Sequence, residues 1–465
     1  MQPSETPDLS WIPPYLDRIR SYVSVRLSDN ILIRMPNECF KLNPSGARLL
    51  NFLLQGGSLE RVLAERSGDR EAPAQINDFF IALMLMLGHR MCERFQSGAV
   101  EKVAYALGYI ELPVLAELAV TDQCNIRCRF CYGSCRCGVQ AGSRDGNRPS
   151  ELDTRGFKRI IDIIRDDAEV PSMSFTGGEP TLRDDLPALI RYAARKKTMR
   201  VNLISNGTLI TPSLARTLRL ALLASAQISI ESPDPAIHDA LTRVPGSHAR
   251  SVAGVRALQQ EGIHVHFHAT TCTENAASLA NMPAFAATLR IDRFSLNMLI
   301  PVGRGQDDEL AVRYREMPGI LEPIIRSAAA EGVTFMWYAP TPLCIFNPVA
   351  RQLGNKSCAA CDGLLAIDPR GNVLPCSSWN ETVGSLLESD FESIWFGARA
   401  TWLRGKKAAP TECDGCTDFA VCQGACPLYF DAFPQDRNDL ICRKAACMTE
   451  ENNGVHFHTS GISTP

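Results

Sequence analysis

The sequence predicts an α/β protein with a parallel sheet at its centre, a small module before the sheet and a cysteine-rich region after it. Six strand-like runs alternate with helical patterns between residues 112 and 310, which is typical of parallel βα units. The chain also contains 18 cysteines in 465 residues. These indicate metal ligands, because disulfides are rare in the cytoplasm, where a chain without a signal peptide is expected.

Composition and charge exclude several classes of protein. With 45% hydrophobic residues and a net charge of -3, the chain is an ordinary globular protein that lacks the basic blocks of a nucleic-acid-binding protein. No apolar run approaches the ~20 residues that cross a bilayer. The start, Met1–Pro7, lacks the charged and apolar regions of a signal peptide, so we expect a cytoplasmic location without membrane or nucleic-acid partners.

Residues 1–100 are expected to form a small winged-helix-like module that follows a Pro-rich leader. Asn43 is the predicted N-cap of one helix and Ser58 precedes the next. The expected strands are Tyr22–Leu27, Ile31–Arg34 and Cys39–Leu42. The first expected helix has Pro44 in its first turn, Ala47–Leu54 apolar on one side and Gly56-Gly57 at its end; a short helix after Ser58 and a third at Ala74–Leu87 follow.

Residues 112–310 are expected to form the parallel sheet, with ligands at the carboxyl ends of its strands. The expected strands are Val114–Thr121, Ser172–Thr176, Val201–Ser205, Gln227–Glu231, His264–Thr271 and Phe294–Ile300. The clearest expected helices are Phe157–Ile164, Leu186–Ala194 and Leu214–Ala224, and a further helix is expected at Arg313–Ala330.

Three cysteines directly after the first of these strands have the spacing CX3CX2C: Cys124, Cys128 and Cys131. Three thiolates on a tight loop can bind three irons of a [4Fe-4S] cube, which leaves the fourth iron open to a small molecule. A zinc or disulfide site is the less favoured alternative, because zinc prefers paired CX2C units.

This motif, with Phe130 in its aromatic position and Gly177-Gly178-Glu179-Pro180 after the second strand, resembles the radical S-adenosylmethionine (SAM) superfamily. The resemblance implies a partial (β/α)6 barrel. It also implies that the open iron holds SAM, which is cleaved reductively to a 5′-deoxyadenosyl radical that abstracts a hydrogen atom from the substrate.

The same resemblance implies the SAM-binding residues. Glu179 is expected to hold the amino group of SAM, and the flanking glycines to let the backbone approach the ligand. Arg250 is a further candidate for the carboxylate of SAM. The expected cofactor-binding residues are Gly177, Gly178, Glu179, Pro180, Ser205, Asn206, Ser229 and Glu231. For Ser205 and Asn206 a plain turn is nearly as favoured.

The cysteines from Cys358 onward resemble the SPASM extension of peptide- and sulfatase-maturing enzymes, since they have the order CX9GX4C, CX2CX5CX3C, C. The resemblance implies two further, fully ligated [4Fe-4S] clusters within residues 311–450. The first would be held by Cys358, Cys361, Cys376 and Cys426, and the second by Cys413, Cys416, Cys422 and Cys442. Ser377 replaces the Asp of sulfatase-maturing relatives, which makes sulfatase maturation less favoured. Residues 451–465 are expected to form a disordered tail.

The N-terminal pattern Lys41–Ala47 resembles the PqqD-like peptide chaperone of pyrroloquinoline quinone synthesis. That fold recognises the leader of a precursor peptide by adding it as a strand to a sheet edge, here expected near Ile31–Arg34. The alternative is a winged helix that packs on the enzyme or binds DNA, although the module has few basic residues.

The resulting hypothesis is a radical SAM/SPASM enzyme that modifies a ribosomally synthesised peptide. Its expected partners are the precursor peptide, bound through its leader, and an external electron donor of the flavodoxin or ferredoxin type. The alternatives are an enzyme acting on a small molecule such as a haem precursor, and a non-catalytic iron-sulfur redox regulator. No catalytic acid or base is identified.

Several residues have no assigned role in this hypothesis. They are Cys135, Cys137, Cys447 and the imidazoles His264, His266 and His268, which share one face of a strand. A polar face that meets a helix and water is slightly favoured for these imidazoles over a substrate cavity, a proton relay or a metal site.

Overall fold

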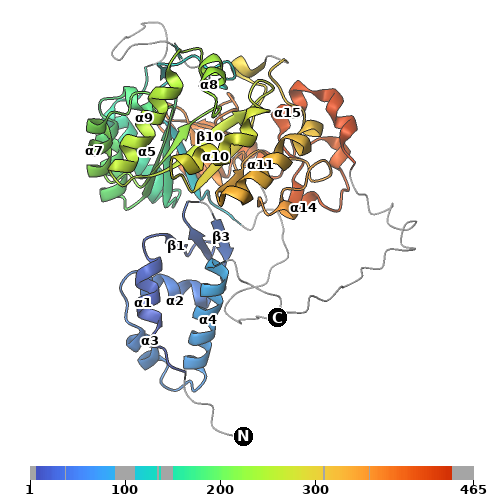
Figure 1. The fold of residues 1–465 in the computed structure, drawn as a ribbon. Coiled ribbons are helices and arrows are strands. Elements are labelled where there is room, and N and C mark those ends of the chain that lie inside the picture. The colour runs from blue at the N-terminus through green and yellow to red at the C-terminus, as the bar shows by residue number, and fades with distance from the viewer. Residues whose placement is uncertain are drawn as a thin grey trace, which may run out of the picture.

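The computed structural model describes residues 7–36, 38–88, 110–133, 136–137, 150–306, 309–354 and 357–441. A small N-terminal module lies below a larger α/β body, and the C-terminal region lies at one side of that body (Figure 1). None of the helices in these ranges is long and apolar enough to cross a membrane. The tail 451–465, Cys442 and most of the loop that contains Cys135 lie outside the described residues.

The N-terminal module is a three-stranded antiparallel sheet covered by helices, as the sequence predicts. Asn43 and Ser58 are the N-caps of α2 and α3, and each side chain accepts a hydrogen bond from the backbone three residues later. Its elements are α1 (Ile12–Ile19), β1 (Val23–Arg26), β2 (Ile31–Arg34), β3 (Glu38–Lys41), α2 (Pro44–Leu54), α3 (Leu59–Glu65) and α4 (Ala72–Leu87).

Helix α1 was not predicted and lies within the Pro-rich leader that was expected before Tyr22; it contains Pro13 and Pro14. Both prolines occupy the first turn, where no intrahelical hydrogen bond is lost. The helix buries Ile12, Leu16 and Ile19 against the other helices of the module. A proline-rich start is therefore compatible with a packed helix.

The expected peptide-binding edge at Ile31–Arg34 is wrong. These residues form β2, which is the central strand of the order β1-β2-β3 and pairs on both sides. The edges of the sheet are β1 and β3. All residues of β3 are half-buried, whereas β1 begins and ends with buried residues. The more accessible edge is therefore β3.

The module is fixed to the larger body through the second face of its sheet. Ile31 and Ile33 pack against Val114, which directly precedes the first strand of the body. A buried ion pair joins Arg26 to Asp29 at 2.7 Å, and Arg26 also donates to the carbonyls of Pro113 and Leu112. The module is thus docked at the amino ends of the body's strands.

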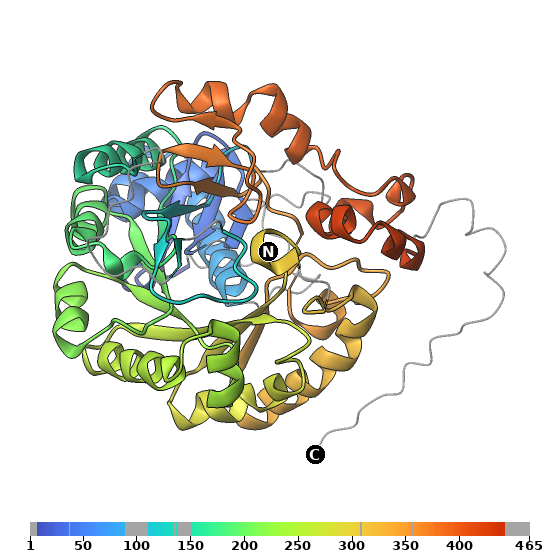
Figure 2. The same ribbon diagram turned by 90° about the horizontal axis from the view of Figure 1, so that it is seen from above.

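The body contains a ten-stranded sheet in the order β12-β11-β10-β9-β8-β7-β4-β13-β14-β15, in which every pair from β12 to β13 is parallel. Figure 2 shows this sheet curved into an open barrel with helices outside it. The strands are β4 (Leu115–Ala119), β7 (Ser172–Thr176), β8 (Arg200–Ser205), β9 (Ser225–Ser229), β10 (His264–Thr271), β11 (Arg293–Met298) and β12 (Thr334–Trp337). The expected α/β fold with a parallel sheet is confirmed.

Helices cover the outer face of this sheet. On β10, for example, Val265, Phe267 and Ala269 face the helices and belong to the main hydrophobic core. A π-helical turn at Tyr192–Lys196 extends α6. The helices are α5 (Thr154–Asp166), α6 (Leu186–Arg191), α7 (Pro212–Leu220), α8 (Pro235–Thr242), α9 (Ser247–Gln260), α10 (Met282–Thr288) and α11 (Met317–Glu331).

The cysteine-rich region continues the same sheet. Strand β13 pairs in parallel with β4, so this region lies directly beside the strand that leads to the CX3CX2C motif. Its elements are β13 (Leu364–Ile367), β14 (Asn372–Leu374), β15 (Gly384–Ser385), α12 (Phe391–Trp395), α13 (Ala398–Arg404), α14 (Phe419–Cys422) and α15 (Pro427–Ala432).

Candidate active site

The loop from Cys124 to Cys131, here called the cluster loop, follows β4 and is held from two sides. The amides of Arg127 and Arg129 donate to the last two residues of α8, at 3.0 and 2.9 Å. Arg304 donates to two carbonyls of the loop, at 3.0 and 3.1 Å. The loop is therefore fixed at the carboxyl end of the sheet, where the sequence places it.

The three thiols of the cluster loop are close enough to influence one another. Burial, followed by the nearby charges of Glu231, Cys124 and Cys131, raises the pKa of the Cys128 thiol well above its usual value. Three thiolates gathered here would repel one another unless a cationic group lay among them. The donor set therefore fits an iron-sulfur cluster.

Gly177 and Gly178 hold the end of β7 against the start of the cluster loop. A Cβ on Gly177 would lie 2.4 Å from the carbonyl oxygen of Thr121, and one on Gly178 would lie 2.1 Å from that of Gln123. The backbone also bonds here, since the Gly178 amide donates to Thr121 at 2.7 Å. The close approach that requires glycine is thus to the chain itself, whereas the sequence suggested an approach to the ligand.

Glu179 is buried and joins the ends of β7 and β8. Its carboxylate accepts hydrogen bonds from Ser205 Oγ and the Asn206 amide, both at 2.8 Å, and from Thr181 Oγ1 at 2.5 Å. Burial raises the pKa of Glu179, and these hydrogen bonds act in the opposite direction. Three of the expected SAM-binding residues therefore form one network, and Pro180 begins the short 3-10 helix that follows.

Asn206 links this network to the cluster loop. Its side-chain nitrogen lies 4.0 Å from the Cys124 sulfur and donates to Asn125 Oδ1 at 2.9 Å. The alternative interpretation, in which Asn206 forms a turn, is also supported, because Asn206 Oδ1 accepts a hydrogen bond from the Thr208 amide. The residue therefore shapes a turn and also touches the first cysteine.

Glu231 lies two residues beyond the end of β9, whereas the sequence placed it inside that strand. Its carboxylate accepts from the Thr270 amide at 2.9 Å, and its own amide donates to His238 Nδ1 at 3.1 Å. Burial raises the pKa of Glu231 to about 7. Since its charge also acts on Cys128, Glu231 lies beside the cluster loop, while Ser229 ends β9 next to His268 in the register.

Arg250 lies away from these groups. It is exposed on α9 and donates to the carbonyl oxygen of Pro245 at 3.3 Å. It also lines an outer groove with Thr208. The structure does not bring Arg250 together with Glu179 or Glu231.

The imidazoles of β10 lie on the inner face of the sheet, opposite the helix-facing Phe267. His266 Nε2 is 3.1 Å from Gln227 Oε1, and His268 Nδ1 is 2.9 Å from Ser295 Oγ. Burial lowers the pKa of His266 to about 3 and that of His268 to about 4. The favoured sequence interpretation was a polar face against a helix and water, whereas these two half-buried, neutral imidazoles contact polar side chains of the neighbouring strands.

Sequence reasoning missed two further groups on the inner face. Tyr338 follows β12 and stacks on His268 with ring centroids 6.4 Å apart. Glu117 of β4 is half-buried and accepts a hydrogen bond from Ser377 Oγ at 2.5 Å. A carboxylate therefore lies beside the serine that replaces the sulfatase-type Asp. The available signal was the period-two alternation of Leu115–Ala119, which places Glu117 on the face opposite Ala116 and Leu118.

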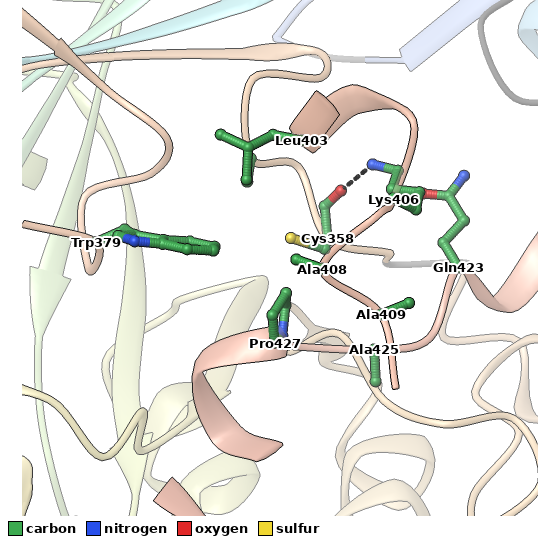
Figure 3. A pocket seen from close by; sticks show the side chains of 10 residues that line it. Cys358, Trp379, Leu403, Lys406, Ala408, Ala409, Gln423, Ala425 and Pro427 are labelled. Carbon is green, nitrogen blue, oxygen red and sulfur yellow. Dashed lines mark hydrogen bonds between the residues drawn. The ribbon is translucent and has the colours of Figure 1, made fainter. Parts of the chain in front are cut away.

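The four cysteines expected at the first auxiliary cluster lie near one another. The nearby charges of Cys358 and Cys426 add to burial in raising the pKa of Cys376, and Cys358 acts in the same way on Cys361. Figure 3 shows Cys358 among small side chains and Trp379, with Lys406 Nζ donating to the Cys358 carbonyl oxygen at 2.5 Å. The pocket beside Cys358 is therefore lined mainly by apolar side chains, together with the polar groups of Lys406 and Gln423.

Three cysteines of the second auxiliary set are described: Cys413, Cys416 and Cys422. Cys344 has no motif spacing to these cysteines, so it could not be connected with them from the sequence. The neighbouring Leu343 amide lies 3.4 Å from the Cys422 sulfur. The Cys344 thiol accepts a hydrogen bond from the backbone of Ile441, directly before Cys442.

The described thiols are not gathered around one point as the ligands of a single metal ion are. A zinc site places thiolates about 2.3 Å from one point. In the part of the chain that the structure describes, no group of three Cys, His, Asp or Glu side chains could hold one metal ion. Ligands of a [4Fe-4S] cube bind different irons and stand further apart.

Comparison with known proteins identifies the chemistry of this site. Residues 118–285 match the radical SAM superfamily, and residues 358–417 match the SPASM iron-sulfur cluster-binding domain. The protein is a radical SAM enzyme. Its cofactors are SAM and [4Fe-4S] clusters, including auxiliary clusters in the SPASM domain.

Two curated relatives of this radical SAM enzyme have different substrates. The AdoMet-dependent heme synthase of Nitratidesulfovibrio vulgaris is 26% identical over 66% of this chain and 85% of its own length. The mycofactocin maturase MftC of Mycobacterium ulcerans is 27% identical over 76% of this chain and 91% of its own length. Because the two sequence identities are nearly equal, they do not favour either of these two activities for this chain.

Among solved structures, Streptococcus suis SuiB bound to its precursor peptide SuiA is similar, with a TM-score of 0.65 and 16% identity. The match covers 88% of this chain and 95% of SuiB. Residues from Ile110 onward make up less than that share of this chain. The similarity in fold therefore extends into the N-terminal module of this radical SAM enzyme.

Proposed function

We propose that this radical SAM/SPASM enzyme modifies a ribosomally synthesised precursor peptide that it binds through a leader. The observation that carries the proposal is a small sheet that packs against the barrel and whose edge strand β3 has only half-buried side chains. A sheet edge binds an extended peptide through main-chain hydrogen bonds, which also raises the local concentration of the attached segment.

The register of the sheet identifies the amides that a leader would meet. The Leu42 amide bonds to Asn30, so Phe40 and Glu38, at alternate positions, face β2. The backbone groups of Cys39 and Lys41 therefore point to the outer edge. Arg34, which is paired with Glu38 of β3, donates to the carbonyl oxygen of Leu87 at the end of α4, so this helix end lies near the start of β3.

The similar proteins support a peptide substrate. SuiB is solved in complex with a precursor peptide and matches this chain into the N-terminal module. The match with mycofactocin maturase also covers more of this chain than that with heme synthase. A module retained for peptide recognition explains the extent of the SuiB match.

The inner face of the barrel is suited to a polypeptide. His266, His268, Gln227 and Ser295 are polar and hydrogen-bonded to one another. Both imidazoles are neutral because burial lowers their pKa to about 3 and 4. Such groups offer hydrogen bonds to amides and side chains without demanding a charged partner. SAM, when bound, supplies the radical that abstracts hydrogen, and an external one-electron protein of the flavodoxin or ferredoxin type supplies the reducing electron.

The test uses the outer amide of β3. Lys41→Pro removes this amide and should weaken binding of a fluorescent leader peptide, taken from the precursor encoded beside the gene, by about tenfold or more. Lys41→Ala keeps the amide but removes the side chain, which donates to Asp29 O, and should bind nearly as the native protein. Equal affinity of all three proteins for the leader would contradict the proposal.

A haem precursor is the second candidate, supported by the heme synthase relative. In that case the imidazoles of β10 would meet the carboxylates of a macrocycle, and the N-terminal module would serve only for packing. Optical titration with a porphyrin precursor separates the two candidates. The peptide proposal predicts no saturable change in the porphyrin spectrum.

A further inference from the structure

An open groove lies on the outer surface between α7 and α9, which contact each other along the same side of the barrel (Figure 1). Its volume is about 440 Å³. The residues that define it include Thr208, Ile210, Pro212, Arg250, Ala253 and Arg256.

The groove reaches the cluster loop through a short chain of hydrogen bonds. Thr208 Oγ1, at the groove wall, accepts from Asn125 Nδ2 at 2.8 Å. Asn125 in turn accepts from Asn206 Nδ2 at 2.9 Å, and that nitrogen lies 4.0 Å from the Cys124 sulfur. Two side chains therefore separate the groove wall from the first ligand of the SAM cluster.

Exposed arginines surround this point although the whole chain carries a net charge of -3. Arg250 and Arg256 line the groove. Arg216 lies one helical turn after Pro212, on the same face of α7. Arg127 belongs to the cluster loop, and Arg243 follows the α8 residue that accepts its amide hydrogen bond.

None of these five arginines makes an ion pair with a described residue. By contrast, Arg219 at the far end of α7 pairs with Glu261 at 2.8 Å. The nearby Asp239 is occupied, because it accepts from the amides of Gly246 and His248. The positive charge around the groove is therefore available to a partner.

We propose that this arginine-lined groove is the docking surface for a small acidic one-electron carrier protein that reduces the SAM cluster. The proposal rests on the protein donor proposed above and names its place on the chain. One electron leaves the reduced carrier, which is oxidised by one electron, and enters the cluster, with no bond made or broken. Opposite charges accelerate such encounters and make them sensitive to salt.

The test compares two double charge reversals. Arg216→Glu/Arg256→Glu changes the groove, whereas Arg48→Glu/Arg326→Glu changes two exposed arginines elsewhere that also make no ion pair with described residues. The probe is a reduced bacterial flavodoxin, and uncoupled SAM cleavage is followed without any substrate. Dithionite, a small chemical reductant, serves as the second electron source.

The groove variant should lower flavodoxin-driven cleavage and flavodoxin affinity about tenfold at low ionic strength, and the difference should vanish near 0.5 M salt. Dithionite-driven cleavage and iron content should stay at native levels, and the control variant should behave as native protein in every assay. Equal flavodoxin affinity of the groove variant and the control variant would overturn the proposal. It would also be overturned if the groove variant lost binding to DNA or inorganic phosphate while it kept its affinity for flavodoxin. Because no substrate is used, failure of the peptide proposal leaves this result unaffected.

Discussion

Single residues of this enzyme hold strand ends together rather than acting alone. Glu179 collects hydrogen bonds from Thr181, Ser205 and Asn206, and Asn206 reaches the Cys124 sulfur. A carboxylate with several donors is fixed in one orientation, so it can present a defined face to a ligand amino group. Its role in SAM binding stays a prediction.

Glu179→Gln tests this role, because an amide oxygen can accept some of these hydrogen bonds but carries no charge. We expect SAM affinity to fall about tenfold or more, since a charged hydrogen bond contributes about 1.5–3 kcal/mol. Equilibrium dialysis of SAM measures the change. Glu274→Gln, at a half-exposed residue that pairs with Arg129, is the matched control and should bind SAM as the native protein does.

The inner imidazoles predict a dependence of stability on pH. His266 and His268 have folded-state pKa values of about 3 and 4, whereas a histidine of the unfolded chain titrates near 6.5. The unfolded state therefore binds more protons between pH 6.5 and 4, and stability falls as pH is lowered through this window. Each histidine adds up to about 1.4 kcal/mol per pH unit.

Denaturant titrations from pH 7 to 5 should show a shallower loss of stability for His268→Gln than for the native protein. Ser295→Ala removes the hydrogen-bond partner of His268 but keeps the imidazole, so it should retain the native slope. A native slope in His268→Gln would contradict the assignment of a neutral buried imidazole.

At the scale of elements, the sequence predicted best where one physical signal dominates. Strands β7 and β10 have the expected bounds, since β7 ends directly before Gly177-Gly178 and β10 shows strict alternation of polar and apolar residues. Strand β9 ends at Ser229, two residues before the predicted end at Glu231. The prediction extended too far because the apolar pattern continues through Ile230, after strand pairing has stopped. The pattern of residues also could not show that β2 is the central strand of the small sheet, because strand order depends on long-range pairing.

The site was predictable only as far as spacing alone defines it. The CX3CX2C motif and the glycine motif are defined by residue spacing along the chain, and both of these motifs lie where strands end. Contacts such as Glu117 with Ser377, or Leu343 with Cys422, join segments far apart in the sequence. No local pattern predicts them.

The cluster loop and the SPASM region are separate elements, which gives a prediction for iron content. Native protein reconstituted anaerobically should bind about twelve irons, and the triple variant of Cys124, Cys128 and Cys131 to Ala about eight. Uncoupled cleavage of SAM to 5′-deoxyadenosine should disappear in the variant. Iron analysis with detection of 5′-deoxyadenosine checks both, and residual cleavage in the variant would refute the assignment.

At the scale of the whole molecule, the N-terminal module and the cluster loop lie at opposite ends of β4. The module packs on Val114 before this strand, and the thiols follow it. A stretch of about six residues rises roughly 20 Å. A leader bound at β3 must therefore be joined to the modified residue by at least about six extended residues.

Precursor peptides with shortened spacers test this geometry. Modification should persist while the spacer exceeds this length and should fall sharply below it, although leader affinity stays constant. Mass spectrometry of each peptide gives the extent of modification. Full modification of a precursor with only three spacer residues would contradict the bound position of the leader.

The central claim is that the enzyme acts on a peptide through its leader, and competition between peptide forms tests it most directly. With reductant and SAM present, native enzyme should change the mass of the full precursor, and free leader in excess should inhibit this change. The core peptide without its leader should react at least about tenfold more slowly. An unchanged precursor together with conversion of a porphyrin substrate would contradict the account.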